Sequence, residues 1–242
     1  MTESTRKRLE NVEGIIDLTL PVRKHWRWGF HRTYERDYTF GHPLREEYLY
    51  MPVHCFTHID PPAHATEGEK TIDQVPLSDL IGYARIVDLS HKEQNAEITD
   101  ADLDEKGGHV AKGDIVVVKT CQGLRYSVDQ QEFWTTSPYM AESSGKWLVE
   151  KGVRAVAFDF PQDYVLRDFF KGIIPSLDDM TMHKALLKAG IIQIEYITNL
   201  HLVDANSVLF FAIPLRLEGV AGSPARVFAV ENASSLILNR IR

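Results

Sequence analysis

The sequence contains little cysteine, no long apolar run and no excess of positive charge. Only two of the 242 residues are cysteines, Cys55 and Cys121, which excludes a framework of disulfide bonds. A membrane-spanning helix needs about eighteen consecutive apolar residues, and no such stretch occurs, so no membrane partner is expected. A formal net charge of -7 disfavours a nucleic-acid binder, because such a protein needs a basic surface to neutralise phosphates.

The N-terminus lacks the apolar core of a signal peptide. It begins MTESTRKRLE, and residues 1–12 are expected to be disordered or frayed. Hydrophobic residues make up 44% of the chain and charged residues 25%, as in an ordinary globular protein. No repeat, linker or low-complexity tract interrupts the sequence. We therefore expect one domain over residues 1–242, located in the cytoplasm.

The most distinctive stretch reads MPVHCFTHIDPPAH and covers residues 51–64. It holds His54, His58, Asp60 and His64 within eleven residues. Imidazole nitrogen and carboxylate oxygen together suit zinc, manganese or iron. A single histidine in an apolar run is more often a packed or surface residue, but three histidines and an aspartate so close together favour a metal site.

The spacing of these residues limits the backbone that they can adopt. On a helix, His54 and His58 share a face but Asp60 points well away from both. On an extended strand the Cα atoms of His54 and His58 lie about 13 Å apart, at roughly 3.3 Å per residue, which two imidazoles can barely bridge. We therefore expect a bent, partly coiled segment, in which the two prolines after Asp60 turn His64 back over the site. His64 is then a ligand, an acid–base group or a loop-stabilising residue. Cys55 is expected to be a small packed residue, because adjacent residues rarely both reach one ion.

A second unusual stretch, residues 22–50, mixes aromatic side chains with arginines and shows neither a period of 2 nor one of 3.6. Such a mixture can stack flat ligands or single-stranded bases, and it is also common at subunit interfaces. We predict a long irregular loop. It would form a wall of the substrate pocket, with Trp26 and Trp28 as candidates, or a contact between subunits. RNA binding is the weakest alternative because of the net charge of -7.

Strand and helix patterns alternate along the rest of the chain. Apolar runs predict strands at residues 15–20, 84–90, 114–120, 153–160, 191–197, 209–217 and 225–231, the last two joined as a hairpin. Capping residues and apolar spacing predict helices at residues 100–106, 138–151 and 182–189, and a polar loop is expected at 122–136. The pattern favours an α/β fold with a mixed sheet and antiparallel C-terminal strands.

Two further polar residues stand out later in the chain. His183 lies near the start of a predicted helix, and Glu195 lies on the strand that follows. A histidine in the first turn of a helix is more often a surface residue. A carboxylate in the apolar run IIQIEYI is harder to explain, because burying an unpaired charge is costly unless a metal or a positive partner relieves it. A short helix that returns to a strand can bring the two side chains together.

Several motifs together resemble the cyclase family of metal-dependent hydrolases, which includes bacterial kynurenine formamidase and isatin hydrolase. The segment IIDLTL at residues 15–20 looks like the opening strand of that family. The spacing His-x3-His-x-Asp-x-Pro-x-His at residues 54–64 is similar to its signature, His-x-Gly-Thr-His-x-Asp-x-Pro-x-His. His183 and Glu195 match its second motif, and FAIPLRL with the later GSPAR, within residues 211–226, resembles its closing segment. The matches follow the family order and cover most of the chain.

The resemblance implies how the clustered residues are used. One divalent ion would be held by three ligands and a second by two more, with the aspartate bridging both. These five ligands would be His54, His58, Asp60, His183 and Glu195. The resemblance implies one or two ions per subunit, with zinc or manganese as the expected metals.

The resemblance also implies an activity and an assembly. A metal-activated water would hydrolyse an amide, cyclic amide or lactone bond of a small aromatic or carboxylate-bearing substrate, and His64 would transfer the proton. The fold would be an α/β swivelling β/β/α type that forms a homodimer or homotetramer. Phe56 replaces the usual glycine, and Gln162 lies where the family often has serine, so both are expected to line the substrate pocket. The competing hypothesis is a non-catalytic metal- or ligand-binding protein with the same fold.

Overall fold

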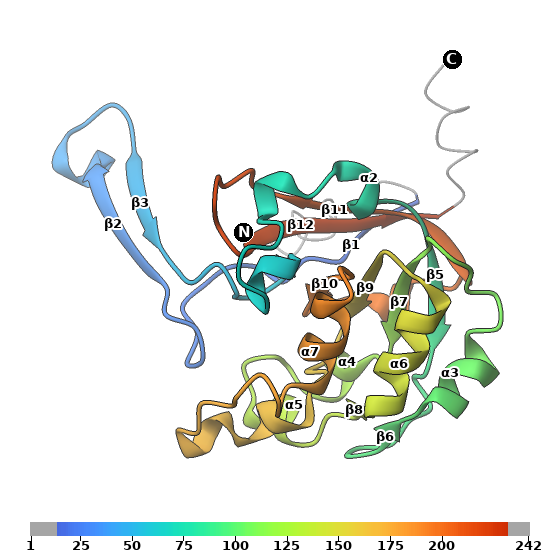
Figure 1. Ribbon diagram of the computed structural model, residues 1–242. Coiled ribbons are helices and arrows are strands. Elements are labelled where there is room, and N and C mark those ends of the chain that lie inside the picture. The colour runs from blue at the N-terminus through green and yellow to red at the C-terminus, as the bar shows by residue number, and fades with distance from the viewer. Residues whose placement is uncertain (1–13, 232–242) are drawn as a thin grey trace.

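A mixed eight-stranded sheet forms the centre of the molecule (Figure 1). The strand order is β1-β12-β11-β5-β7-β9-β10-β4, and β4 also pairs with β12, so the sheet curls back on itself. The strands are β1 (Ile15–Asp17), β4 (His58–Asp60), β5 (Ile81–Asp88), β7 (Ile115–Lys119), β9 (Ala155–Phe158), β10 (Ile192–Glu195), β11 (Ser207–Pro214) and β12 (Ser223–Val230). This computed structural model describes residues 14–231, so the frayed segment expected at residues 1–12 lies outside the described residues.

The middle of the sheet is parallel and its flanks are antiparallel. β5, β7, β9 and β10 run parallel to one another, whereas β11 and β12 pair as an antiparallel hairpin. The predicted α/β fold with a mixed sheet and antiparallel C-terminal strands is therefore confirmed. All five residues of β7 are buried, as their continuous apolar sequence predicts. Val117 joins one apolar core with residues of β11 and β12, while Val116 and Val118 join a second core with the helices.

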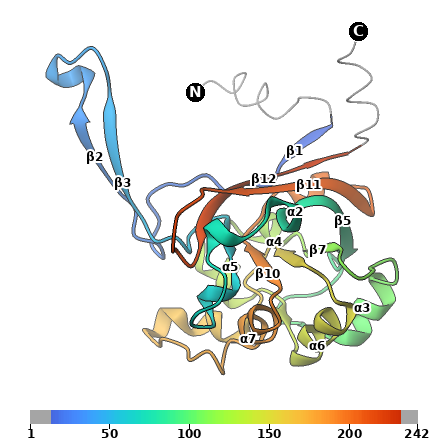
Figure 2. The ribbon, with the colours of Figure 1, turned by 45° about the horizontal axis from the view of Figure 1, so that its top comes forward.

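Three helices cover one face of the parallel strands (Figures 1 and 2). They are α3 (Asp100–Lys106), α6 (Glu142–Lys151) and α7 (Thr181–Lys188). The helix predicted from residue 138 begins later, because β8 (Tyr139–Met140) pairs with β6 (Glu97–Ile98) just before it. Between residues 14 and 231, no helix combines the length and the apolar character that a membrane crossing demands.

Three shorter helices connect these elements. They are α2 (Leu77–Leu80), α4 (Gln122–Arg125) and α5 (Gln131–Thr135). The expectation of a polar loop at residues 122–136 is thus wrong in part, since α4 and α5 lie within it. Helices of four or five residues are too short to show a helical period, and α5 is held by the burial of Phe133 and Trp134.

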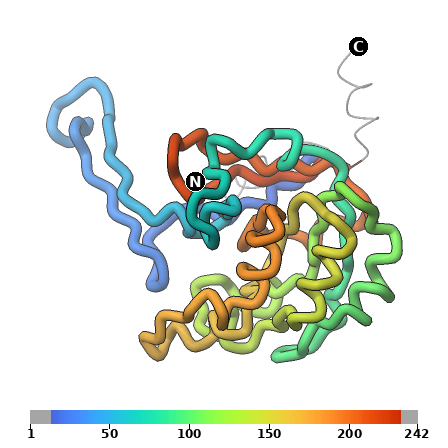
Figure 3. The backbone as a smooth tube through the Cα atoms, viewed as in Figure 1, coloured from blue at the N-terminus to red at the C-terminus, as the bar shows by residue number. Residues whose placement is uncertain are grey.

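The segment expected to be an irregular loop is instead a projecting hairpin. β2 (His31–Arg36) pairs antiparallel with β3 (Glu46–Tyr50), and a short 3-10 helix at Tyr38–Phe40 forms its tip. The hairpin extends away from the sheet in both ribbon views, and the backbone path in Figure 3 leaves and rejoins the body at one place. All of β3 and nearly all of β2 are exposed. Because neither face is buried, no alternation of apolar and polar residues marks these strands.

Candidate metal centre

Two neighbouring strands carry three of the expected ligands. β4 presents His58 and Asp60 on one side, because the two residues are two positions apart, and β10 presents Glu195. The antiparallel register places Glu195 opposite His58 and Gln193 opposite Asp60. All four side chains are buried. Pairing within the sheet therefore brings together residues that lie far apart in the sequence.

The chain just before β4 is bent, as the spacing of its histidines predicts. Phe56 has a φ of 52°, in the left-handed region that side chains rarely adopt. The bend brings Nδ1 of His54 to 2.6 Å from Oδ1 of Asp60. The Phe56 ring is buried and packs against Trp28 at a centroid distance of 4.5 Å. Aromatic packing thus stabilises a conformation that glycine would adopt freely.

The chain after β4 turns back over the site. Residues 62–64 form a 3-10 helix, and the His64 ring stacks on His54 with the centroids 3.8 Å apart. The same ring lies 5.5 Å from the His183 ring. Just before β12, a Cβ added to Gly222 would overlap the His54 imidazole, so this glycine permits the close approach of the two segments.

The helix α7 contributes His183 to the same cluster. Its Nε2 atom lies 3.1 Å from Oε1 of Glu195 and 3.7 Å from Oδ2 of Asp60. On the other side, Nε2 of His58 lies 3.3 Å from Oδ1 of Asp60 and 3.6 Å from Oε2 of Glu195. The structure thus brings together the five residues expected as ligands, with His64 beside them.

The donors of this cluster fit a divalent cation. Oδ2 of Asp60 is buried and has no hydrogen-bond partner in the described part of the chain, which is costly for a carboxylate unless a cation lies nearby. The ligand atoms form two groups of three, and within each group the atoms lie within 4.8 Å of one another. One group comes from His54, Asp60 and His64, and the other from His58, Asp60 and Glu195. Asp60 belongs to both groups, as a bridging ligand would. Imidazole and carboxylate are ligands that zinc, manganese and iron accept.

Opposite charges shape the protonation of the cluster. Burial raises the pKa of Asp60, but the imidazoles of His58 and His54 outweigh it and hold that pKa well below its ordinary value. Burial lowers the pKa of His58, yet the carboxylates of Asp60 and Glu195 raise it to about 9. The two carboxylates therefore attract positive charge into the site. His64 differs, because burial and the neighbouring imidazoles lower its pKa to about 4.

A loop after β9 forms hydrogen bonds to two of the expected ligands, Glu195 and His183. Gln162 is fully buried and donates hydrogen bonds from Nε2 to Oε1 of Glu195 and to the side chain of Gln193. The adjacent Asp163 accepts from the His183 ring, with Oδ2 2.6 Å from Nδ1, so Nε2 of that ring faces the cluster. Asp163 was not anticipated from the sequence. The sequence holds only a weak signal for it, a second polar residue beside Gln162 in the loop after a buried strand.

A small hollow of about 120 Å³ opens beside the cluster. Trp28 and Tyr196 line it, whereas Trp26 is 46% exposed and stacks on Phe170. Phe56, expected at the pocket, is buried in the aromatic layer behind it. The lining residues are Arg27, Trp28, His54, His58, His64, Leu166, Met180, His183, Glu195 and Tyr196.

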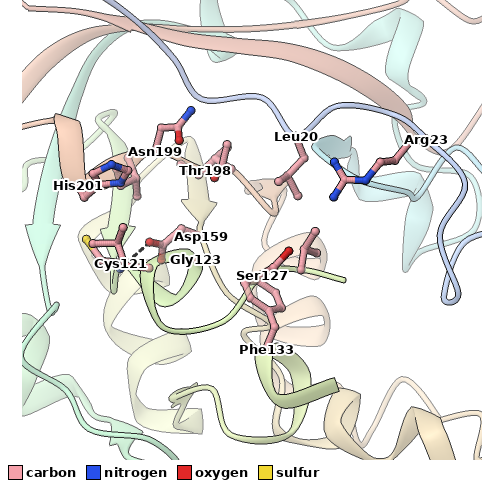
Figure 4. Close-up of a pocket in the computed structure, with 14 residues that line it drawn as sticks. Leu20, Arg23, Cys121, Gly123, Ser127, Phe133, Asp159, Thr198, Asn199 and His201 are labelled. Carbon is pink, nitrogen blue, oxygen red and sulfur yellow. Dashed lines mark hydrogen bonds between the residues drawn. The ribbon is translucent and has the colours of Figure 1, made fainter. Parts of the chain in front are cut away.

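A second hollow of about 170 Å³ is lined in part by Val128 and Phe133 of that aromatic layer (Figure 4). It is found where β7 and β9 end, and it contains Cys121 and Asp159. Asp159 accepts hydrogen bonds from the backbone and hydroxyl of Thr120 and from the backbone of Cys121. Burial nevertheless raises its pKa to about 6. None of the ten residues predicted for the site from the sequence lines this hollow.

Comparisons with known proteins give a consistent result. The family described as putative cyclase matches residues 16–162, more than half of the chain. A kynurenine formamidase of Bacillus thuringiensis (strain Al Hakam) is 30% identical over 181 residues, which cover 74% of this chain and 76% of that protein. A kynurenine formamidase of Salinibacter ruber (strain DSM 13855 / M31) is 27% identical over 182 residues, with the same coverage of both chains.

Solved structures also share the fold. A potential metal-dependent hydrolase with cyclase activity superposes with a TM-score of 0.67 and 29% identity, over 89% of this chain and 96% of that chain. Isatin hydrolase A from Labrenzia aggregata superposes with a TM-score of 0.73 and 19% identity, over 94% of this chain and 98% of that one. At that lower identity the second likeness concerns the fold alone.

Proposed function

The chain belongs to the putative cyclase family, and from that premise we propose that it is a metal-dependent hydrolase of a small amide, cyclic amide or lactone. The observation that carries the proposal is the convergence of several imidazoles on two buried carboxylates, Asp60 and Glu195. These groups lie beside a hollow that can admit a substrate. The likeness to kynurenine formamidases over 74% of the chain supports an amide carbon–nitrogen bond as the one cleaved.

The ligands that we propose for one or two divalent ions are the five residues of the cluster. When bound, such an ion lowers the pKa of a water molecule towards neutrality and polarises a carbonyl group. Zinc and manganese both suit the donor set. The proposed ligands are His54, His58, Asp60, His183 and Glu195.

His64 is the residue that we propose for proton transfer. Its pKa of about 4, lowered by burial, keeps the imidazole neutral at pH 7, so one ring nitrogen has a free lone pair and readily passes on any proton that it takes up. Stacking on His54 fixes the plane of the ring beside the ligands. Trp28 and Tyr196 would pack against an aromatic substrate in the hollow and exclude water from it.

The test combines metal removal with a variant of His64. Protein stripped with a chelator should lose hydrolysis of N-formylkynurenine, isatin and simple lactones, and zinc or manganese should restore activity towards at least one of them. His64→Asn should lower turnover by about 100-fold, while elemental analysis finds the bound metal unchanged. Full activity in stripped protein would contradict the proposal, and metal binding without any hydrolysis would favour a binding protein instead.

We propose in addition that the chain forms a homodimer or a larger homo-oligomer through the β2–β3 hairpin. Tyr48, Leu49 and Tyr50 are each more than half exposed on β3, and a lone two-stranded hairpin is marginally stable in water. Aromatic residues and arginines, which are abundant in this hairpin, are enriched where subunits meet. Sedimentation velocity would measure the assembly directly.

A further inference from the structure

Arg27 differs from the other arginines that bury a nitrogen atom. Its half-buried guanidinium donates no hydrogen bond to any residue within 14–231, and one of its nitrogens, Nη1, is buried. Arg125 and Arg154 each have one such nitrogen too, but other nitrogens of their guanidinium groups donate to backbone carbonyl oxygens. The Arg27 guanidinium lies against rings instead, with Cζ 4.3 Å from the centroid of Trp134 and 4.0 Å from that of Phe169. Aromatic faces attract the charge but accept no strong hydrogen bond.

The position of Arg27 gives its unpaired guanidinium a role. Arg27 lines the same hollow of about 120 Å³ as the histidines of the metal cluster, together with Trp28 and Tyr196. A closed cavity of about 150 Å³ holds one benzene molecule, and this smaller hollow is open on one side, so an aromatic ring can enter it with part of the ring outside. A ring placed there brings its substituents close to the guanidinium. The planar, forked donors of arginine match a carboxylate better than any other common acceptor except phosphate.

We infer that Arg27 binds a carboxylate on the substrate and thereby selects anionic aromatic amides over neutral ones. This inference rests on the proposed hydrolase function and names its substrate class. The rings of Trp134 and Phe169 hold the guanidinium plane, so little conformational freedom is lost when the carboxylate binds. A neutral substrate leaves the guanidinium beside the hollow unpaired, and a mismatch of this kind lowers kcat/KM by about 10- to 100-fold.

Two aryl formamides form a matched pair of probes for this inference. 2-Formamidobenzoate and formanilide share the formamide and the ring, and only the first carries a carboxylate. With zinc- or manganese-loaded enzyme, kcat/KM for 2-formamidobenzoate should be at least about 10-fold higher. Arg27→Met should lower that value by about 10- to 100-fold, mainly through KM, and change the value for formanilide by less than about 3-fold.

Two further variants separate charge from structure. Arg27→Lys keeps the charge but loses the fork, and it should recover part of the activity towards 2-formamidobenzoate. Arg226→Gln is the matched control, because Arg226 is an exposed arginine on β12 that pairs with Asp17, and its kinetics should equal those of the wild type. Equal losses for both probes in Arg27→Met, or no loss for either, would overturn the inference.

A binding measurement makes the inference independent of turnover. Calorimetric titration with 2-aminobenzoate, the product expected from 2-formamidobenzoate, should give a dissociation constant at least about 10-fold weaker in Arg27→Met than in the wild type. If neither formamide is hydrolysed but this difference remains, the hydrolase proposal fails and the carboxylate site stands. Inorganic phosphate serves as the competing anion: binding as tight as that of 2-aminobenzoate and equally dependent on Arg27 would overturn the assignment to an aromatic carboxylate.

Discussion

The metal centre and the β2–β3 hairpin are held by the chain in opposite ways. In the centre, the fully buried Asp60 lies close to imidazoles from two separate segments of the chain, residues 54–58 and α7. In the hairpin, every residue of β3 is exposed, and the two strands pair with each other rather than with the main sheet. The side chains of the metal centre are therefore positioned by the main sheet and a helix. The hairpin is held mainly by hydrogen bonds between its own two strands.

The difference teaches what each region needs from outside the chain. Buried carboxylates need positive charge close by, because an unpaired charge inside a protein is costly. Exposed aromatic side chains need an apolar surface if their area is to contribute to stability. The centre therefore points to a cation, and the hairpin points to a second protein surface.

The largest effect is expected from Asp60→Asn. The amide keeps the shape of the side chain but loses the charge that both groups of candidate ligands share. We expect metal binding to fall below detection at micromolar concentrations and hydrolysis to fall by about 1,000-fold or more, because the activation of water is lost. Elemental analysis and initial rates measure both. Glu218→Gln is the control, since Glu218 is exposed. Wild-type metal content in Asp60→Asn would remove this residue from the centre.

A smaller loss is expected from Asp163→Asn. The amide cannot accept hydrogen bonds at both positions, so either the His183 ring or the backbone N–H of Met182 loses its partner. Loss of such an outer contact weakens metal binding by about 10- to 100-fold. A competition titration with a chromophoric chelator measures the affinity. Asp178→Asn is the control. Asp178 is a surface carboxylate that pairs with Lys184 of α7, the helix of His183, and the variant should bind metal normally. Equal affinities in all three proteins would show that Asp163 does not hold His183 for the metal.

Asp159 shows what burial does to the pKa of a carboxyl group when no imidazole is among the causes of the shift, in contrast to Asp60. Its pKa in the folded chain is about 6, above the ordinary 3.8, so the folded state binds more protons between those values. The free energy of unfolding contributed by this residue is therefore highest below pH 4, falls as the pH rises towards 6, and is constant above that. With a pKa of about 6 in place of 3.8, the change is about 3 kcal/mol. The free energy of unfolding in urea at pH 4, minus that at pH 7.5, should be lower in Asp159→Asn than in the wild type, because the variant lacks the stability that protonated Asp159 contributes at pH 4. The same difference in both proteins would refute this account of Asp159.

The smallest effect on folding is expected in the hairpin. Replacing Tyr48 and Tyr50 by serine should change the free energy of unfolding of the monomer by less than about 1 kcal/mol, because both side chains are exposed. The dissociation constant of self-association should rise by about 10-fold or more. Urea unfolding in dilute solution and sedimentation velocity measure the two quantities. Tyr83→Ser alters an exposed tyrosine on β5 and distinguishes the hairpin from that face of the sheet. Unchanged association in the hairpin variant would place the subunit contact elsewhere.

The two regions also differ in how far their sequence predicts them. The bent segment with His54 and His58 could be predicted, because its spacing excludes both a straight helix and a flat strand. β7 could be predicted because a strand buried on both faces must be apolar throughout. Glu195 could be singled out because its charge conflicts with its apolar neighbours. In each case burial restricts which residues the chain can carry.

The remaining features depend on contacts that leave no local pattern. The hairpin was missed because strands exposed on both faces need no alternation. Asp163 was missed because its role requires α7 to lie beside the loop after β9, and no spacing along the chain records that. The left-handed Phe56 was not foreseen either, since only the surrounding rings make that conformation tolerable.

The double pairing of β4 has a consequence for mechanics as well as chemistry. This three-residue strand joins β10 on one edge to β12 on the other, and two of its three residues are proposed ligands. The same peptide groups that complete the ring of strands thus set the distance between His58 and Asp60. A cation bound to β4 would stabilise its pairing with both β10 and β12. Slower amide hydrogen exchange in β12 would therefore report that the metal site is occupied.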